Sequence, residues 1–295
     1  MKNEIYNNLK ISEELINKAV KVEKEIEEEF KKAKEISMVN SIKVLNAFQE
    51  SNLQEMHFNS STGYGIDELG RNKIEEIYAK IFKAEDALVR TQFISGTHAL
   101  SITLSALLKP NDTMLSITGA PYDTLQTVIG ISKEQSESSL KSYGVKYEQI
   151  ELVNNEFDVK KIQERLSKND IKLVEIQRSR GYSTRKSLTI NKIENIIKKI
   201  REVNTEVIVM VDNCYGEFVE DKEPIEIGAD IAVRFIDEKF RSRDCNLRSI
   251  CSRKKRINKI MCRKVNCPRN WKRNWTIFRS KYKFAKRSIF CTKCC

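Results

Sequence analysis

Long apolar runs, a secretory leader and glycine in the last part of the chain are all missing from this sequence. The 295 residues contain no run of about 18 consecutive apolar residues, the length that a membrane-spanning helix needs. The first residues, MKNEIYNNLK, lack the apolar stretch of a signal peptide. We therefore expect a soluble, cytoplasmic protein with no membrane partner, long enough to bury a sizeable core.

Glycine and acidic residues are scarce after residue 233. Residues 234–295 contain none of the ten glycines, but 21 Lys and Arg against 3 Asp and Glu, seven of the eight Cys and both Trp. The net charge of +12 therefore divides into +18 for this segment and −6 for residues 1–233, which carry 32 basic and 38 acidic residues. Such a change of composition at one position predicts three parts: a helical segment at 1–60, a domain at 61–233 and a basic tail at 234–295.

Residues 1–233 alternate between helical and strand patterns. Ser12 is the expected N-cap of an amphipathic helix over residues 12–30, and a short helix is expected over 41–49. After a Gly- and Ser-rich loop at 60–70, the patterns predict helices over 71–82, 95–108, 159–166 and 189–203, and strands over 87–90, 114–117, 145–152, 173–177 and 207–212. This alternation predicts an α/β domain with a mostly parallel sheet and flanking helices.

The last of these strands ends in polar side chains. The run VIVMVDNCYGEF at 207–218 is apolar without interruption up to Asp212, as in a strand buried on both faces of a parallel sheet. Ligands of open α/β sheets bind beyond the carboxyl ends of the strands, where Asp212 is placed to pair with a protonated ring nitrogen of a cofactor. The alternative is that Asp212 only caps the turn that follows it.

Two further segments have the residue types of a phosphate-cofactor site. Ser95, Gly96 and Thr97 stand at a predicted helix start, where free backbone N–H groups and the helix dipole favour a phosphate. Tyr122 follows a Gly-Ala-Pro turn after a strand, and an aromatic face there can stack on a planar ring. Each feature has an ordinary alternative, a simple helix cap or a half-buried tyrosine, and His98 has the pattern of a packed helix residue.

Several motifs, in this order, resemble a known family. TGYGIDELGR, ISGTHAL, SITGAPYDTL, IQRSRGYSTR and VMVDNCYGEFVE are similar to those of the bacterial aluminium-resistance, methionine gamma-lyase-like family, over about residues 1–233. Its members are pyridoxal-phosphate enzymes related to cystathionine lyases, with the aspartate-aminotransferase fold (pyridoxal-phosphate fold type I). The resemblance implies a carbon–sulfur lyase that acts on a sulfur-containing amino acid and forms homo-oligomers, here with an incomplete large domain and without the C-terminal domain.

The same resemblance implies pyridoxal 5'-phosphate contacts for particular residues and implies no metal site. Gly96 and Thr97 would hold the phosphate, Tyr122 would stack on the ring, Asp212 would pair with its nitrogen, and Gln177 would lie near its hydroxyl. The full set of cofactor-binding candidates, of which the last two would reach the cofactor of a neighbouring subunit, is Ser95, Gly96, Thr97, Tyr122, Gln177, Asp212, Tyr64 and Arg71.

The family's Schiff-base lysine, which binds the cofactor and moves protons at the substrate, is not found at its place. In the family it follows GADI in a stretch like AGSLIKN, whereas residues 234–239 read RFIDEK and the resemblance ends at about Val233. Codons of the tail read one nucleotide later turn each Trp into Gly and begin near GSLMKN, the family motif. We predict that residues 234–295 are an out-of-frame translation without a native fold, that Lys239 is not the family's lysine, and that the chain is catalytically inactive.

Other interpretations of the tail remain. Lys and Arg runs with interleaved Trp271, Trp275, Phe278 and Tyr282 resemble a nucleic-acid-binding segment, although charge alone accounts for nonspecific binding of polyanions. We expect no specific nucleic-acid partner. The cysteines lack a paired C-x₂-C framework and the tail has no His, which argues against zinc. The last alternative is an inactive remnant that pairs with an intact paralogue.

Overall fold

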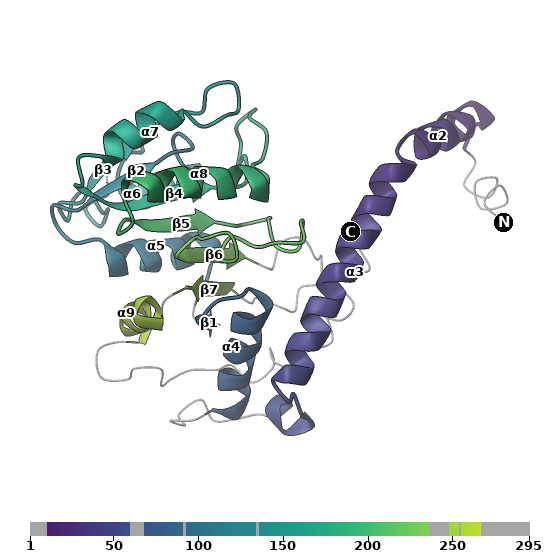
Figure 1. Cartoon of the computed structure of the whole chain (residues 1–295), viewed down its shortest axis with the longest axis horizontal. Helices are drawn as coiled ribbons and strands as arrows, with labels where there is room; N and C mark the ends of the chain where they lie inside the picture. Colours follow the sequence, from purple (N-terminus) through teal and green to yellow (C-terminus); the bar gives the residue numbers. More distant parts are fainter. Residues whose placement is uncertain are drawn as a thin grey trace.

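The computed structural model describes residues 11–59, 68–90, 93–133, 136–235, 248–253 and 255–266, which form a twisted sheet covered by helices (Figure 1). The strands are β1 (Asp86–Arg90), β2 (Thr113–Ser116), β3 (Lys146–Gln149), β4 (Ile171–Gln177), β5 (Ile208–Asp212), β6 (Ile231–Phe235) and β7 (Arg248–Ser252). The helices are α2 (Glu13–Glu25), α3 (Glu27–Glu50), α4 (Leu69–Ile81), α5 (Gly96–Leu107), α6 (Asp123–Ile129), α7 (Val159–Leu166), α8 (Ile190–Val203) and α9 (Lys255–Asn266), with a 3₁₀ turn η1 (Glu55–Phe58).

The sheet is mixed and mostly parallel, as the sequence predicts. Its strand order is β1-β7-β6-β5-β4-β2-β3. Strands β2 to β6 pair in parallel, and β7 runs antiparallel to both of its neighbours, β6 and β1. Gln177 at the end of β4 lies level with Asp212 at the end of β5. Because the carboxyl ends of parallel strands meet at one edge of a sheet, the segments that follow β2, β4 and β5 converge there.

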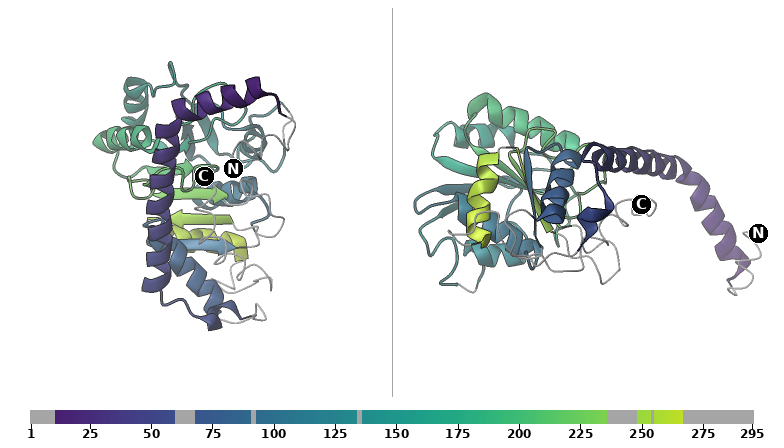
Figure 2. Two further views of the ribbon diagram at one scale, coloured as in Figure 1. Left: turned by 90° about the vertical axis from the view of Figure 1, so that its right-hand side faces the viewer. Right: turned by 90° about the horizontal axis from the view of Figure 1, so that it is seen from below.

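Helices cover both faces of the sheet (Figures 1 and 2). The core on one face joins the strands to α3, α4, α7 and α8, and the core on the other face joins them to α5, α6 and α9. Strand β5 shows why its sequence has no polar break: Val209 and Val211 belong to the first core, and Met210 belongs to the second. The prediction of a strand buried on both faces is therefore confirmed.

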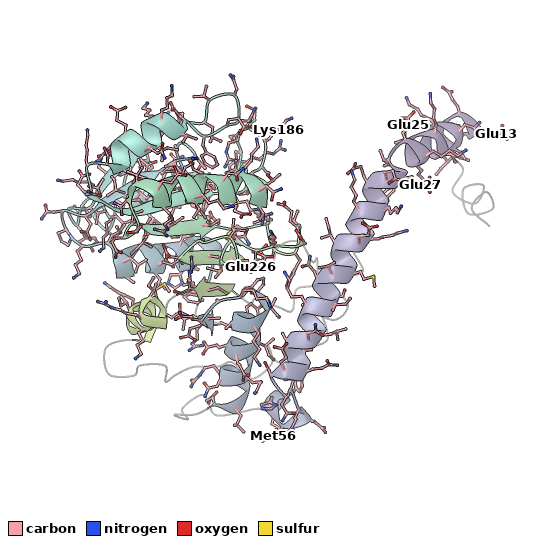
Figure 3. All side chains as sticks on the ribbon, viewed as in Figure 1. Glu13, Glu25, Glu27, Met56, Lys186 and Glu226 are labelled. Atoms are coloured by element: carbon pink, nitrogen blue, oxygen red, sulfur yellow. The ribbon has the colours of Figure 1, made fainter. Side chains whose placement is uncertain are left out.

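The first two helices form an arm that leaves the body of the molecule (Figures 2 and 3). Ser12 caps α2 as predicted, because its side chain accepts a hydrogen bond from the Leu15 N–H. The predicted helices over 12–30 and 41–49 are, however, divided at Ile26, and α3 is continuous from there, since the intervening residues favour helix. No residue of α2 is buried, and the far end of the arm carries Glu13, Glu25 and Glu27 into solvent. Among the described helices, none is both long and apolar enough to cross a membrane.

Part of the basic tail belongs to the fold, which corrects the expectation of no native structure after about residue 233. Strand β7 fills the place between β1 and β6, and Ile250 on it is buried. Ile257 and Met261, one helical turn apart on α9, are buried in the core that also contains α5. A few apolar residues within a cationic segment are thus sufficient for one strand to join the sheet and for one face of a helix to pack on it. Lys239 lies outside the described residues.

Candidate functional site

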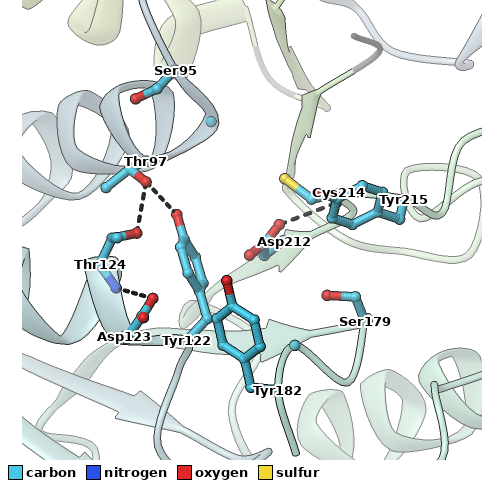
Figure 4. A pocket seen from close by; sticks show the side chains of 12 residues that line it. Ser95, Thr97, Tyr122, Asp123, Thr124, Ser179, Tyr182, Asp212, Cys214 and Tyr215 are labelled. Atoms are coloured by element: carbon cyan, nitrogen blue, oxygen red, sulfur yellow. Dashed lines mark hydrogen bonds between the residues drawn. The ribbon is translucent and has the colours of Figure 1, made fainter. Parts of the chain in front are cut away.

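A cavity of about 420 Å³ lies at the carboxyl edge of the sheet (Figure 4). Its walls come from the start of α5, the start of α6, the segment after β4 and the end of β5. The described residues that line it are Ser95, Gly96, Thr97, Tyr122, Asp123, Thr124, Ser179, Gly181, Tyr182, Asp212, Cys214 and Tyr215. The volume lies within the range of about 300–1,000 Å³ that is usual for small-molecule sites.

Asp212 provides a buried carboxyl group to this cavity. It is the last residue of β5 and is 1% exposed. The backbone N–H of Cys214 donates to Asp212 Oδ1 at 3.1 Å, and the Cys214 side chain also hydrogen-bonds this carboxyl group. Burial raises the pKa of Asp212 above its ordinary value, while hydrogen bonds from the side chain and the backbone of Cys214 oppose the shift. A buried carboxylate without a cationic partner is stabilised by any cation or N–H donor that enters the cavity.

Tyr122 forms an aromatic wall whose position is fixed at both ends. Its hydroxyl lies 2.8 Å from Thr97 Oγ1, which in turn lies 2.9 Å from Thr124 Oγ1 (Figure 4). At the other end, the backbone N–H of Tyr122 donates to Gln177 Oε1 at 2.9 Å. Burial raises the pKa of the Tyr122 phenol to about 12, with Asp212 adding to the rise and the two threonine hydroxyls opposing it. The ring is therefore a neutral, oriented surface at physiological pH.

The start of α5 faces the same cavity. Ser95 is the N-cap of α5, and its Oγ accepts a hydrogen bond from the His98 N–H at 3.0 Å. The Ser95 side chain therefore acts as a helix cap, which was the alternative to phosphate binding. The N–H groups of Gly96 and Thr97 belong to the first helical turn and have no intrahelical acceptor. Together with the positive end of the helix dipole they suit an anion. The His98 ring accepts from the Ile94 N–H at 3.2 Å and is not part of the cavity wall.

The structure brings five of the predicted site residues to one cavity, and two other described ones, Gln177 and Arg71, are not on its wall. The five on its walls are Ser95, Gly96, Thr97, Tyr122 and Asp212. Gln177 lies behind the wall, where it binds the Tyr122 N–H and donates to the Ser179 carbonyl at 3.1 Å. Arg71 lies on α4 and is 1% exposed, and its contact with the cofactor of a neighbouring subunit stays a prediction. Tyr64 lies outside the described residues.

Other wall residues were not predicted as site residues. Tyr182, 91% exposed, and Tyr215, 45% exposed, stand at the rim of the cavity, and Cys214 lies between Asp212 and the rim. Tyr182 is part of IQRSRGYSTR, and Tyr215 stands three residues after Asp212, where the strand ends. The signal was therefore present in the motifs, but single-residue patterns do not show which loop side chains face a common space.

Arg178, also unpredicted, anchors the loop that carries Cys214 and Tyr215. It is 3% exposed and stands directly after β4. Its Nη1 donates to Asn213 Oδ1 and to the Gly216 carbonyl, both at 2.8 Å, and its Nη2 donates to Glu220 Oε1 at 2.6 Å. A Cβ at Gly216 would meet Asn213 Oδ1 at 2.4 Å and Arg178 Nη1 at 2.7 Å, so only glycine permits this close approach.

Two chemical groups are not found around the cavity in the described part of the chain. None of its described wall residues is Lys or Arg, so no cationic side chain is placed there. Likewise, the described residues contain no cluster of three or more His, Cys, Asp and Glu side chains that could hold a metal ion. The chemical resources of the site are one buried carboxyl group, helix-start N–H groups, hydroxyls and aromatic faces.

Comparison with known proteins shows which family the chain belongs to. The model of the methionine gamma-lyase family matches residues 15–238. The chain belongs to the methionine gamma-lyase family. The protein YnbB of Bacillus subtilis (strain 168), which is uncharacterized, is 41% identical over 219 residues, covering 74% of this chain and 52% of YnbB. The chain thus spans about half the length of that curated relative.

Solved structures agree with the family at the level of the whole fold. A carbon-sulfur lyase involved in aluminum resistance from Clostridium novyi NT is 32% identical, with a TM-score of 0.90 over 98% of this chain and 69% of that chain. A candidate cystathionine beta-lyase involved in aluminum resistance from Clostridium acetobutylicum is 41% identical, with a TM-score of 0.89 over 99% and 68% of the two chains. A methionine gamma lyase from Micromonospora echinospora, 17% identical with a TM-score of 0.59 over 80% of this chain and 60% of that chain, shares the fold.

Proposed function

We propose that this member of the methionine gamma-lyase family binds pyridoxal 5'-phosphate in the cavity and derives from a carbon–sulfur lyase acting on small sulfur-containing amino acids. The observation that carries the proposal is the position of buried Asp212 in the same cavity as the N-terminus of α5, with the Tyr122 ring on the wall. The lyases named above, from relatives at 32% and 41% identity, support the reaction class.

The residues present fit this cofactor. Asp212 is buried, its described hydrogen bonds come only from Cys214, and burial raises its pKa, so a protonated pyridine nitrogen would stabilise the ionised carboxylate. The N–H groups of Gly96 and Thr97 provide donors for a phosphate at the helix start. Tyr122, oriented by Thr97 and Gln177, presents its ring to the cofactor ring. When bound, the cofactor withdraws electrons from the substrate and stabilises negative charge beside its α-carbon.

The chain as written binds the cofactor without covalent attachment and does not turn over substrate. No described wall residue is a lysine, and the position where the family's lysine is expected reads RFIDEK at 234–239. Asp212 and Tyr122 can orient the ring, but neither is a base of suitable pKa for moving protons at a substrate carbon: burial raises the pKa of Tyr122 to about 12. The proposal therefore separates cofactor recognition from catalysis.

Binding and attachment are tested separately. In equilibrium dialysis we expect saturable binding of pyridoxal 5'-phosphate, at least about tenfold tighter than that of pyridoxal, because only the former reaches the α5 N-terminus with a phosphate. Equal affinity for the two compounds, or no saturable binding, would refute the proposed site. After borohydride treatment, intact-mass measurement is expected to show no added pyridoxyl group, and an added group would show that a lysine is available after all.

The segment after Val233 supports a second part of the proposal, that residues 234–295 are read out of frame. Arg234, buried at 0% exposure, makes no hydrogen bond to a described residue; its guanidinium lies 3.3 Å from the centre of the Phe82 ring and 3.4 Å from Glu223 Oε2. The side chain of Asn258 on α9 is likewise buried without a described partner. Sequencing the gene across codons 228–240 tests this part. An unbroken frame, shared by relatives with the same cationic ending, would exclude it.

The same family context leads us to a homo-oligomer. The apolar side chains of Leu15, Phe30 and Met38 on the α2–α3 arm are 59%, 52% and 66% exposed, and a second copy supplies an equal surface to cover them. Light scattering after size-exclusion chromatography is expected to give a multiple of the 34.3 kDa chain mass, and a Leu15→Ser, Phe30→Ser variant a smaller one. A wild-type mass equal to one chain would contradict this assembly.

A further inference from the structure

Glu175 is a carboxyl group inside the sheet that the proposed function does not use. It lies on β4 opposite Ser116 of β2 and is 0% exposed. Its Oε2 lies 2.7 Å from Ser116 Oγ, and Ser116 Oγ lies 2.7 Å from the carbonyl oxygen of Gly119. Three oxygens therefore stand in a row, and both spacings between them are hydrogen-bond distances.

The row needs two protons, and only one of its members other than Glu175 can supply a proton. The Ser116 hydroxyl carries one hydrogen, and the Gly119 carbonyl carries none. If Ser116 donates to Glu175, the Ser116 and Gly119 oxygens face each other at 2.7 Å without a proton between them. If Ser116 donates to Gly119, then Glu175 must donate to Ser116, and both spacings are satisfied.

Burial and neighbouring charges favour the same state. Glu175 Oε1 is buried without a hydrogen-bond partner among the described residues, which a neutral acid tolerates far better than a carboxylate does. Burial raises the pKa of Glu175 to about 8, and the charge of Asp212 on β5 adds to the rise. The hydrogen bond with Ser116 and the charge of Arg185 oppose the rise. Tyr147 on β3 lies beside the same groups: burial and the charges of Glu175 and Glu151 raise the pKa of its phenol, while a hydrogen bond with Ser116 opposes the rise. The Tyr147 hydroxyl donates to Gln149 Oε1 at 2.8 Å, so its proton is not needed in the row.

We propose that Glu175 is held as a neutral carboxylic acid and acts as a positioning residue for Tyr122. Its proton completes the chain from Glu175 to Ser116 to Gly119, and this chain ties β4 to the Gly119-Ala120-Pro121 turn that leads into Tyr122. Gln177, two residues further along β4, holds the Tyr122 N–H directly. Strand β4 therefore holds the segment that leads into Tyr122 through Glu175 as well as through Gln177, whose own N–H donates to Thr118 Oγ1 at 3.1 Å. Loss of the Glu175 proton releases the first of these contacts and adds a negative charge near Asp212.

A Glu175→Gln variant tests the proton, because a side-chain amide can donate to Ser116 but cannot titrate. In the unfolded chain Glu175 loses its proton near its ordinary pKa, whereas the folded chain keeps it to about pH 8, so wild-type stability must fall as pH rises between these values. We expect the unfolding equilibrium constant of the wild type to increase about tenfold per pH unit relative to Glu175→Gln, from about pH 5 to about pH 8. Asp212 titrates in both proteins and cancels in the comparison. A ratio that stays constant over this range would show that Glu175 is ionised and overturn the proposal.

The positioning role is tested by amide hydrogen exchange of the segment 116–122. Wild type and Glu175→Gln are expected to exchange alike at about pH 6.5, while at about pH 9 the wild type exchanges roughly fivefold faster, as expected for the loss of one hydrogen bond. Because the two proteins are compared at the same pH, the intrinsic exchange rate cancels. Equal exchange at both pH values would show that the chain of oxygens does not hold the turn. Neither measurement requires a variant that lacks a side chain at position 175.

Discussion

Replacing Arg178 with Met tests whether one buried cation holds the rim of the cavity. Arg178→Met keeps the length and the apolar stem of the side chain but removes all four of its hydrogen bonds, including the bond from Nε to the Leu188 carbonyl. The bond to the Glu220 carboxylate is worth about 1.5–3 kcal/mol, and each neutral bond about 0.5–1.5 kcal/mol. Since Glu220 is 27% exposed and partly regains water, we expect a loss of about 3–4 kcal/mol in the free energy of unfolding.

The loss is measured as the shift of the urea midpoint at constant m-value, followed by circular dichroism. Arg180→Met is the matched control, because Arg180 is the same residue type two positions along and is exposed. That control is expected to change stability by less than about 0.5 kcal/mol. An Arg178→Met cost below about 1 kcal/mol with an unchanged m-value would refute the reasoning, since it would mean that the loop over 213–220 holds its position without the guanidinium.

Three further variants test other contacts. Asp212→Asn is expected to weaken pyridoxal 5'-phosphate binding in dialysis by at least about tenfold. Because the pKa of Asp212 is raised in the folded chain, the free energy of unfolding of the wild type falls as pH rises above the ordinary Asp pKa. Urea unfolding of the Asn variant at several pH values is expected to lack this pH-dependent fall. Arg234→Met combined with Glu223→Gln replaces a buried ion pair by neutral groups and should raise stability by up to about 4 kcal/mol in urea unfolding, whereas a loss would show that the pair is well compensated. Asn40→Ala removes the bonds from Nδ2 to the Phe218 and Glu220 carbonyls, at 3.1 and 3.2 Å, and should raise protease cleavage of α3 at a cost of about 1–3 kcal/mol; unchanged cleavage would contradict this attachment.

Much of the fold could be predicted because local patterns and burial agree. The apolar run before Asp212 indicated a strand covered on both faces, and Val209, Met210 and Val211 are divided between the two cores as expected. The tail was the main failure. Its composition indicated no native structure, yet β7 and α9 lie in the fold with Ile250 and Met261 buried, because a strand or helix needs only a few apolar side chains on its inner face and not an apolar overall composition.

The site residues also divide into some that could be predicted from the sequence and some that could not. Residues at the ends of regular elements were predictable: Asp212 ends a strand, Ser95 caps a helix, and Tyr122 precedes one. Residues that act through long-range packing were not. Arg178 was not singled out in the sequence, because its partners Asn213, Gly216 and Glu220 lie far along the chain.

The order of helices and strands up to Val233, the buried strand that ends at Asp212 and the compositional break after it can be read from the amino acids alone, because hydrophobic period and composition are local properties. The set of loops that share the cavity, the bonds from Arg178 to residues 35 to 42 positions away, and the line of Glu175, Ser116 and Gly119 depend on how the chain packs in three dimensions. These contacts depend on the order in which the strands lie side by side, and strand order is set by the packing of the whole sheet and not by any single segment.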